Sequence, residues 1–161
     1  MNRIEYNSKA NYTFNPSHKG APYMVNGSYC NFGNLCECVA SEYFDGVFGY
    51  DTKAVPFDKG SDIESVSASV KSSGASLACL YGTDKGAIVS EYFERVHSSM
   101  WVYVVELDGV WYLYTMNKAE FSDFLNEWAG LAKESDGERF KVRFKKTSGK
   151  MIAWLDERVG A

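Results

Sequence analysis

A carboxylate and a lysine stand close together near the middle of this sequence, and they are the residues best suited to phosphodiester chemistry. Asp62 precedes the triplet Ser69-Val70-Lys71. If Asp62 and the triplet lie on adjacent strands, the two-residue repeat of a strand places Ser69 and Lys71 on one face. The same rule places Asp62 and Glu64 on a shared face. A carboxylate, a second oxygen ligand and a lysine would then converge at one edge of a sheet.

These residue types match what hydrolysis of a phosphodiester requires. Mg²⁺ prefers oxygen ligands, takes few of them from protein, and fills its other positions with water and phosphate oxygens. The metal polarises the phosphate and supplies hydroxide, while a nearby lysine stabilises the developing charge or orients the water. The pattern predicts a nuclease site with Mg²⁺ or Mn²⁺ as cofactor and DNA as partner.

The elements that must position these side chains follow from hydrophobic periodicity and turn residues. Helices are expected over residues 34–44, 87–97, 117–133 and from about 148 onward. Strands are expected at 47–50, 54–57, 62–66, 67–72, 101–107, 110–116 and 139–145. Residues 1–32 are expected to be irregular, with one short strand at most. The resulting order of elements predicts a mixed α/β fold.

Two local patterns mark the boundaries of elements. Asp108-Gly109 joins two β-rich runs, and this dipeptide favours a two-residue hairpin turn because both positions tolerate positive φ. Asn117 is followed three residues later by Glu120, which is the spacing of a capping box at the start of a helix. We therefore expect a β-hairpin that leads directly into a helix.

Residues 33–105 resemble the PD-(D/E)xK nuclease superfamily, which includes restriction enzymes, Holliday-junction resolvases and phage and repair nucleases. That family has an αβββαβ core, which matches the predicted order of elements. The resemblance implies that Asp62 is the metal-binding aspartate, in a Ser61-Asp62 variant of the motif, and that Lys71 is the motif lysine. A β-α-β-α extension over residues 106–161 would complete a single domain.

Other carboxylates must be considered because this sequence departs from the family at one position. Ser69 stands where the family carries the motif carboxylate. Glu37 lies in the segment Gly33-Asn34-Leu35-Cys36-Glu37, which is similar to the family's Gly-x-x-x-Glu helix and makes Glu37 a candidate metal ligand. Glu64 is a second candidate. Some restriction enzymes with Ser-Val-Lys recruit a glutamate from the following helix, and by that analogy Glu91 or Glu94 is a third.

Charge is distributed unevenly along the chain. The net charge is −4, yet residues 139–161 contain seven basic and two acidic residues, so the tail carries +5 and the remainder −9. The predicted strand at 139–145 alternates aromatic or aliphatic residues with basic ones, which gives it one apolar and one cationic face. The cationic face is either a surface that follows DNA phosphates or an ordinary solvated face of a sheet, and an edge strand kept soluble by lysines would look the same. The candidate DNA-binding residues are Arg139, Lys141, Arg143, Lys145, Lys146 and Lys150.

The composition is that of one soluble domain. The 161 residues are 45% hydrophobic and 24% charged, which suits a single core. The sequence contains neither an apolar run of about 20 residues nor the pattern of a signal peptide, so we expect a cytoplasmic protein without a membrane partner. Cys30, Cys36, Cys38 and Cys79 are then expected to be free thiols.

Two functions remain open at this point. The first is a Mg²⁺-dependent DNA endonuclease of phage- or plasmid-borne recombination or restriction, for which a homodimer is an admissible assembly. The second is a noncatalytic nucleic-acid-binding or interaction protein that keeps the scaffold but has lost the carboxylate at Ser69. Binding of a divalent metal through Asp62 distinguishes them.

Overall fold

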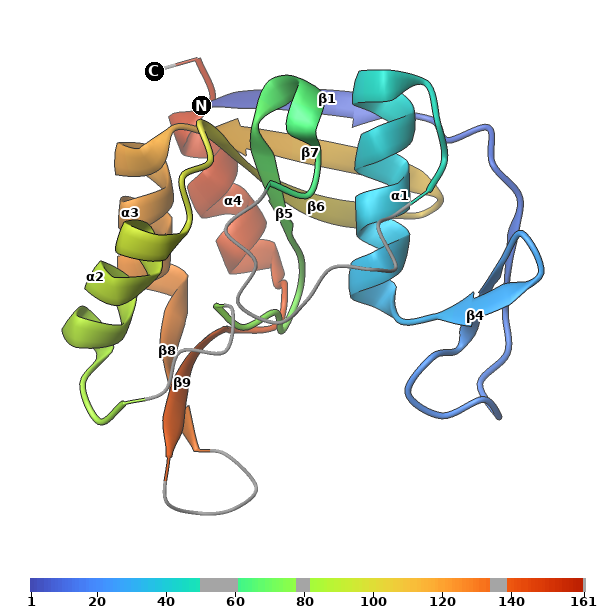
Figure 1. The fold of residues 1–161 in the computed structure, drawn as a ribbon. Helices are drawn as coiled ribbons and strands as arrows, with labels where there is room; N and C mark the ends of the chain where they lie inside the picture. The colour runs from blue at the N-terminus through green and yellow to red at the C-terminus, as the bar shows by residue number, and fades with distance from the viewer. Residues whose placement is uncertain (50–60, 78–81, 134–138, 161) are drawn as a thin grey trace.

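The computed structural model describes residues 1–49, 61–77, 82–133 and 139–160, and within them the protein has a mixed α/β fold (Figure 1). The main sheet has the strand order β1-β7-β6-β5. Its strands are β1 (Asn2–Tyr6), β5 (Ala68–Lys71), β6 (Met100–Leu107) and β7 (Val110–Met116). β1, β7 and β6 are antiparallel neighbours, whereas β5 runs parallel to β6. The sheet is therefore mixed, with its parallel pair at one side.

In the described part of the chain, four helices pack around this sheet. They are α1 (Phe32–Asp45), α2 (Lys85–Arg95), α3 (Lys118–Trp128) and α4 (Gly149–Arg158). In the chain, α2 connects the parallel strands β5 and β6, as a crossover between parallel strands requires. Figure 1 shows α1 apart from the other three helices, with β4 leading straight into it. None of the helices in the described ranges is long and apolar enough to cross a membrane.

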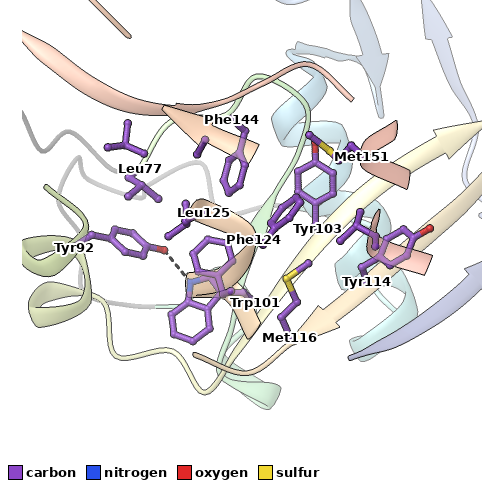
Figure 2. Close-up of a cluster of buried hydrophobic side chains, with 14 of the residues drawn as sticks. Leu77, Tyr92, Trp101, Tyr103, Tyr114, Met116, Phe124, Leu125, Phe144 and Met151 are labelled. Carbon is purple, nitrogen blue, oxygen red and sulfur yellow. Dashed lines mark hydrogen bonds between the residues drawn. The ribbon is translucent and has the colours of Figure 1, made fainter. Parts of the chain in front are cut away.

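The two faces of the main sheet bury separate apolar clusters. On β6, Val102 and Val104 pack with α1, whereas Trp101, Tyr103 and Val105 pack with the other helices. The cluster that contains Trp101, on the face away from α1, is rich in aromatic rings. In it, the buried Trp101 indole donates a hydrogen bond to the Tyr92 hydroxyl at 2.9 Å (Figure 2). Because successive residues of a strand point to opposite faces, β6 supplies both cores at once.

Two small sheets accompany the main one. β2 (Tyr12–Phe14), β3 (Tyr23–Val25) and β4 (Ser28–Cys30) form an antiparallel sheet, and β8 (Ala129–Lys133) pairs with β9 (Phe140–Phe144). β9 has neighbours on both sides. The Leu77 amide donates to the Val142 carbonyl at 3.0 Å, and the Phe144 amide donates to the Ala75 carbonyl at 2.8 Å. Isolated bridges thus flank β9 on the side opposite β8, so it is not a free edge strand, whereas an ordinary solvated sheet face at 139–145 stays a prediction.

Several sequence-based expectations are confirmed. Asp108 and Gly109 form the β6–β7 turn with φ of 52° and 83°. Asn117 and Glu120 form a reciprocal capping box at the start of α3. The first helix, the helix between β5 and β6, and the C-terminal helix all form near their predicted positions, with α1 capped by Asn31 rather than Asn34.

Other expectations were wrong, for identifiable reasons. Residues 1–32 contain four strands, where one at most was expected. The longest of them, β1, is a strand because it pairs with the distant β7, and its own sequence pattern is too short to predict it. Residues 62–66 are not a strand: Ile63 makes one bridge to Ala68, and Glu64–Val66 form a 3₁₀ turn. α3 ends at Trp128, and the expected helix to residue 133 gives way to β8, which pairs with β9. Residues 47–49 are not in a strand, and the expected strand at 54–57 lies outside the described residues.

Candidate functional site

Strand β5 carries the triplet Ser69-Val70-Lys71. Val70 points into the cluster beneath α1, so Ser69 and Lys71 point to the opposite face, as the strand repeat requires. Lys71 lies opposite Tyr103 on β6. Its ammonium lies 5.6 Å from the centre of the Tyr92 ring of α2, which is a cation–π contact. Lys71 is half-buried, and the ring holds its end beside the last residues of β5.

The structure brings Asp62 to the same strand. One carboxylate oxygen of Asp62 accepts a hydrogen bond from the Val70 amide at 2.7 Å. The residue after Asp62 is bridged to Ala68, and their two main-chain hydrogen bonds are both 3.0 Å long. Asp62 is exposed, and its carboxylate thus meets solvent beside the residue that precedes Lys71. The sequence-based expectation that Asp62 and the triplet lie together is met.

Ser69 has a different role from the one that its position in the motif suggested. It is 5% exposed, and its hydroxyl lies 2.7 Å from that of Ser98, which lies 2.8 Å from the hydroxyl of Ser61. This chain of three hydroxyls ties the residue before Asp62 to β5 and to the segment that enters β6. The Ser69 side chain is thus buried and engaged by Ser98 rather than open to solvent.

The four alternative carboxylates lie in different surroundings. Glu64 is exposed on the 3₁₀ turn, so the strand rule that paired its side chain with that of Asp62 does not apply. Glu91 on α2 forms an ion pair with Arg95 at 3.5 Å, both about half exposed. Glu94 is exposed on the same helix. Glu37 is half-buried in the second turn of α1.

Glu37 is the candidate whose helix approaches the end of β5. The Cys36 thiol beside it forms a hydrogen bond with Ser72, the residue that follows Lys71. In the described ranges, no three His, Cys, Asp or Glu side chains are grouped so that they could hold a metal ion together. Asp62 is the exposed carboxylate beside the triplet, and Mg²⁺ is commonly held by one or two protein carboxylates plus phosphate and water.

Two helices begin at the carboxyl end of β5. At α1, the Ser72 hydroxyl lies against the first turn. At α4, the Thr147 amide just before the helix donates to the Ser73 hydroxyl at 3.0 Å. Helix N-termini carry partial positive charge, and ligands of open sheets with parallel strands collect beyond the carboxyl ends of those strands. The local geometry therefore favours an anion beyond Lys71.

A groove opens at the same place, which we call the β6-end groove. Its volume is about 440 Å³, and its lining includes Tyr23, Phe32, Ser73, Glu106, Ser148 and Gly149. β5 ends opposite Tyr103, whereas β6 continues to Leu107, so the last residues of β6 form one side of the groove. Ser73, which lines the groove, follows Lys71 by two residues in the chain.

The basic residues of the C-terminal part do not form one uniform surface. The Arg143 guanidinium donates to the Gly74 carbonyl at 2.8 Å, and the Lys145 ammonium lies 5.9 Å from the Trp128 ring. Arg139 and Lys141 lie on the face opposite Val142. Lys146 and Lys150 are exposed and flank, in sequence, the groove residues 147–149. The alternation predicted for 139–145 is present, but Arg143 is engaged by the protein itself.

The cysteines of the described ranges are buried free thiols. Cys30, Cys36 and Cys38 pack in the cluster beneath α1, and Cys79 lies outside those ranges. Burial raises the pKa of the Cys36 thiol well above its usual range, and burial also raises that of Cys38 to about 12. Thiols held protonated in this way are poor nucleophiles and poor metal ligands.

Sequence reasoning missed Ser61, Ser98 and Tyr92, which hold Asp62, Ser69 and Lys71 in place. Two of them are ordinary serines far apart in the chain, and only the pairing of β5 with β6 brings them together. Tyr92 did stand on a predicted helix, and its place on that helix's apolar side was a usable indication. Comparison of this chain with protein-family models, with curated proteins and with solved structures gave no match.

Proposed function

We propose that this chain is a metal-dependent DNA endonuclease built on a PD-(D/E)xK-like core, with Asp62 as metal ligand and Lys71 as the charged group beside the phosphate. One observation carries the proposal: the Asp62 carboxylate is hydrogen-bonded to the Val70 amide, inside the triplet that ends in Lys71. The order α1, β5, α2, β6, with β5 parallel to β6, supports the proposal, although the described residues between α1 and α2 contain one strand where that core has three.

Each residue has a defined part in this proposal. The Val70 amide orients one oxygen of Asp62 and leaves the carboxylate's other oxygen to face a ligand. When bound, Mg²⁺ or Mn²⁺ would supply Lewis acidity toward a phosphate oxygen and acidify a water molecule. Lys71, held over Tyr92, places a positive charge where charge grows on the phosphate. Glu37 is the first choice for a second carboxylate, because its helix begins beside Ser72.

A second function is favoured by the burial of Ser69. The motif position that carries a carboxylate in active relatives is here a 5% exposed serine within a hydroxyl chain. A protein that kept DNA binding and lost cleavage would look the same at this position. We therefore retain a noncatalytic DNA-binding protein as the alternative.

Cleavage with and without metal separates the two functions. Purified protein would be incubated with supercoiled plasmid and with branched DNA, in Mn²⁺, in Mg²⁺ or in EDTA. A nuclease nicks at least one substrate in metal and none in EDTA, and Asp62→Asn abolishes the nicking. DNA binding without any metal-dependent nicking would reject the endonuclease and support the alternative.

A further inference from the structure

The β6-end groove has two unlike walls. Tyr23 and Phe32 form an aromatic wall, with ring centres 5.8 Å apart. Phe14 continues it on the small sheet: its ring centre lies 5.3 Å from that of Tyr23, and it is 59% exposed. A row of partly exposed aromatic rings beside an open groove offers flat apolar faces to a flat ligand.

The other wall is largely polar, and exposed lysines flank it in the sequence. It consists of residues 147–149 and Ile152 at the start of α4. Lys146 and Lys150 immediately flank this stretch and are exposed. The main-chain amides of a first helical turn add partial positive charge. This wall therefore suits a chain of phosphates.

From these walls we infer that the β6-end groove binds an unpaired DNA strand, with bases against Tyr23 and Phe32 and phosphates along the start of α4. This inference rests on the proposed DNA function and deepens it by naming the form of the substrate. Base stacking on aromatic side chains combined with a cationic rim is the usual chemistry of single-strand binding. A duplex cannot use the aromatic wall, because its base faces are already stacked on one another.

The place of the groove joins it to the proposed site. Ser73 lines the groove and stands two residues beyond Lys71, a distance of roughly 7 Å along an extended chain. The groove has a volume of about 440 Å³, which lies in the range of small-molecule sites, so it holds one or two nucleotides rather than a helix of DNA. A strand that lies in the groove would bring its next phosphate toward Lys71.

The Glu106 carboxylate restricts where phosphates can lie in the groove. It lines the groove from β6 and is exposed. A carboxylate repels phosphates, so the phosphates must keep to the α4 side and leave Glu106 on the side of the bases. A groove built for a basic peptide would instead use Glu106 as its main attraction. The effect of neutralising Glu106 therefore separates these two classes of partner.

The test measures binding in EDTA, so that it does not depend on cleavage. The probe is a fluorescein-labelled oligothymidine of about 15 nucleotides, compared by anisotropy with a blunt duplex of equal length. We expect the single strand to bind about tenfold more tightly than the duplex, since each stacked base contributes a factor of roughly 5 or more. Equal affinity, or tighter binding of the duplex, would overturn the inference.

Gly149→Glu is the variant that should fold and still fail to bind. A side chain at Gly149 meets no atom within 4 Å, and an acidic residue in the first turn of a helix is stabilising. It would place a negative charge in the phosphate wall and should weaken oligothymidine binding about tenfold. The matched control is Ala119→Glu, in the exposed first turn of α3, which should bind as the wild type does.

Glu106→Gln completes the test. Removing this carboxylate should raise oligothymidine affinity by a factor of about 2–5. Unchanged oligothymidine binding by Gly149→Glu would overturn the inference. So would weaker oligothymidine binding by Glu106→Gln together with binding of an alternating Val-Lys peptide in the groove. Failure of the endonuclease proposal appears separately, as an absence of metal-dependent nicking in a protein that still shows these binding differences.

Discussion

The Asp62 carboxylate and the Val70 amide are joined by a hydrogen bond of 2.7 Å, which fastens a bend of the chain to the strand that carries Lys71. The bond gives Asp62 a structural role besides its proposed metal-binding role. The two roles separate when the carboxylate is replaced by its amide, because the amide oxygen can still accept from Val70 whereas the charge is lost.

We predict that Asp62→Asn keeps the fold and abolishes metal-dependent nicking. Asp62→Ala should also lose nicking and, in addition, lower the free energy of unfolding by about 1 kcal/mol, because the Val70 amide loses its partner. Urea denaturation followed by circular dichroism gives the stability, and plasmid nicking in Mn²⁺ gives the activity. Full nicking by Asp62→Asn would remove Asp62 from the site.

Lys71→Met is expected to lower the cleavage rate by roughly 10²–10³ while DNA affinity in EDTA changes little. Methionine keeps an apolar stem against the Tyr92 ring and removes only the charge. Single-turnover cleavage and anisotropy on the same DNA measure the two effects. A parallel fall in binding and cleavage would make Lys71 an ordinary phosphate contact.

Glutamates on α1 and α2 should respond differently to neutralisation. Glu37→Gln is predicted to reduce Mn²⁺-dependent nicking by at least roughly tenfold, as loss of a metal-associated group does. Glu91→Gln is the matched control, because Glu91 pairs with Arg95 on the surface of α2 and such pairs contribute little. Glu64→Gln and Glu94→Gln test the remaining candidates. Nicking that survives in all four variants would leave Asp62 as the sole proposed protein ligand.

Salt dependence should distinguish lysines that contact phosphate from an arginine that holds the fold. For the oligothymidine in EDTA, Lys146→Gln with Lys150→Gln should reduce the slope of log affinity against log salt by about 0.7 per lysine. Arg143→Gln should leave the slope nearly unchanged and lower stability, because its guanidinium donates to the Gly74 carbonyl. An Arg143→Gln slope that falls as far as that of a lysine variant would contradict this division.

Stability should fall as pH rises above about 9, the usual pKa of a cysteine thiol. Burial raises the pKa of Cys36 in the folded protein, so the unfolded chain releases its proton first. The stabilisation is complete below the unfolded pKa and is lost as pH rises toward the raised folded value. Burial likewise raises the pKa of Tyr103 to about 12, which adds to the fall at higher pH.

Urea melts between about pH 8 and 11 would measure this effect for the wild type and for Cys36→Ala. The variant should show a shallower decline, because it lacks one of the titrating groups. Identical pH dependence in the two proteins would show that the Cys36 thiol ionises equally in the folded and unfolded states.

Local patterns in the sequence predicted some elements well. Asp108-Gly109 and the Asn117–Glu120 pair act over a few residues, so their turn and cap could be recognised without knowledge of the rest of the chain. Alternation likewise identified the apolar face of β9. In each case the decisive interaction lies within the segment that shows the pattern.

Where the decisive interaction lies between distant segments, the sequence could not reveal it. Ala129–Lys133 has helical composition, and pairing with β9 makes it a strand. The serine chain that buries Ser69 needs Ser98, which arrives only after α2. Asp62 was correctly expected beside the triplet, but the 3₁₀ turn after it separated Glu64 from the predicted shared face.

The pairing of β1 with β7 has a consequence for the way the chain folds. Asn2 lies opposite Thr115, so an edge of the main sheet closes only after most of the described sequence is available. Pairings with such large sequence separation raise the contact order and slow folding. During synthesis β1 must wait unpaired while α1, β5, α2 and β6 leave the ribosome. A folding experiment with a probe at Tyr6 should therefore report a later phase than one at Trp101.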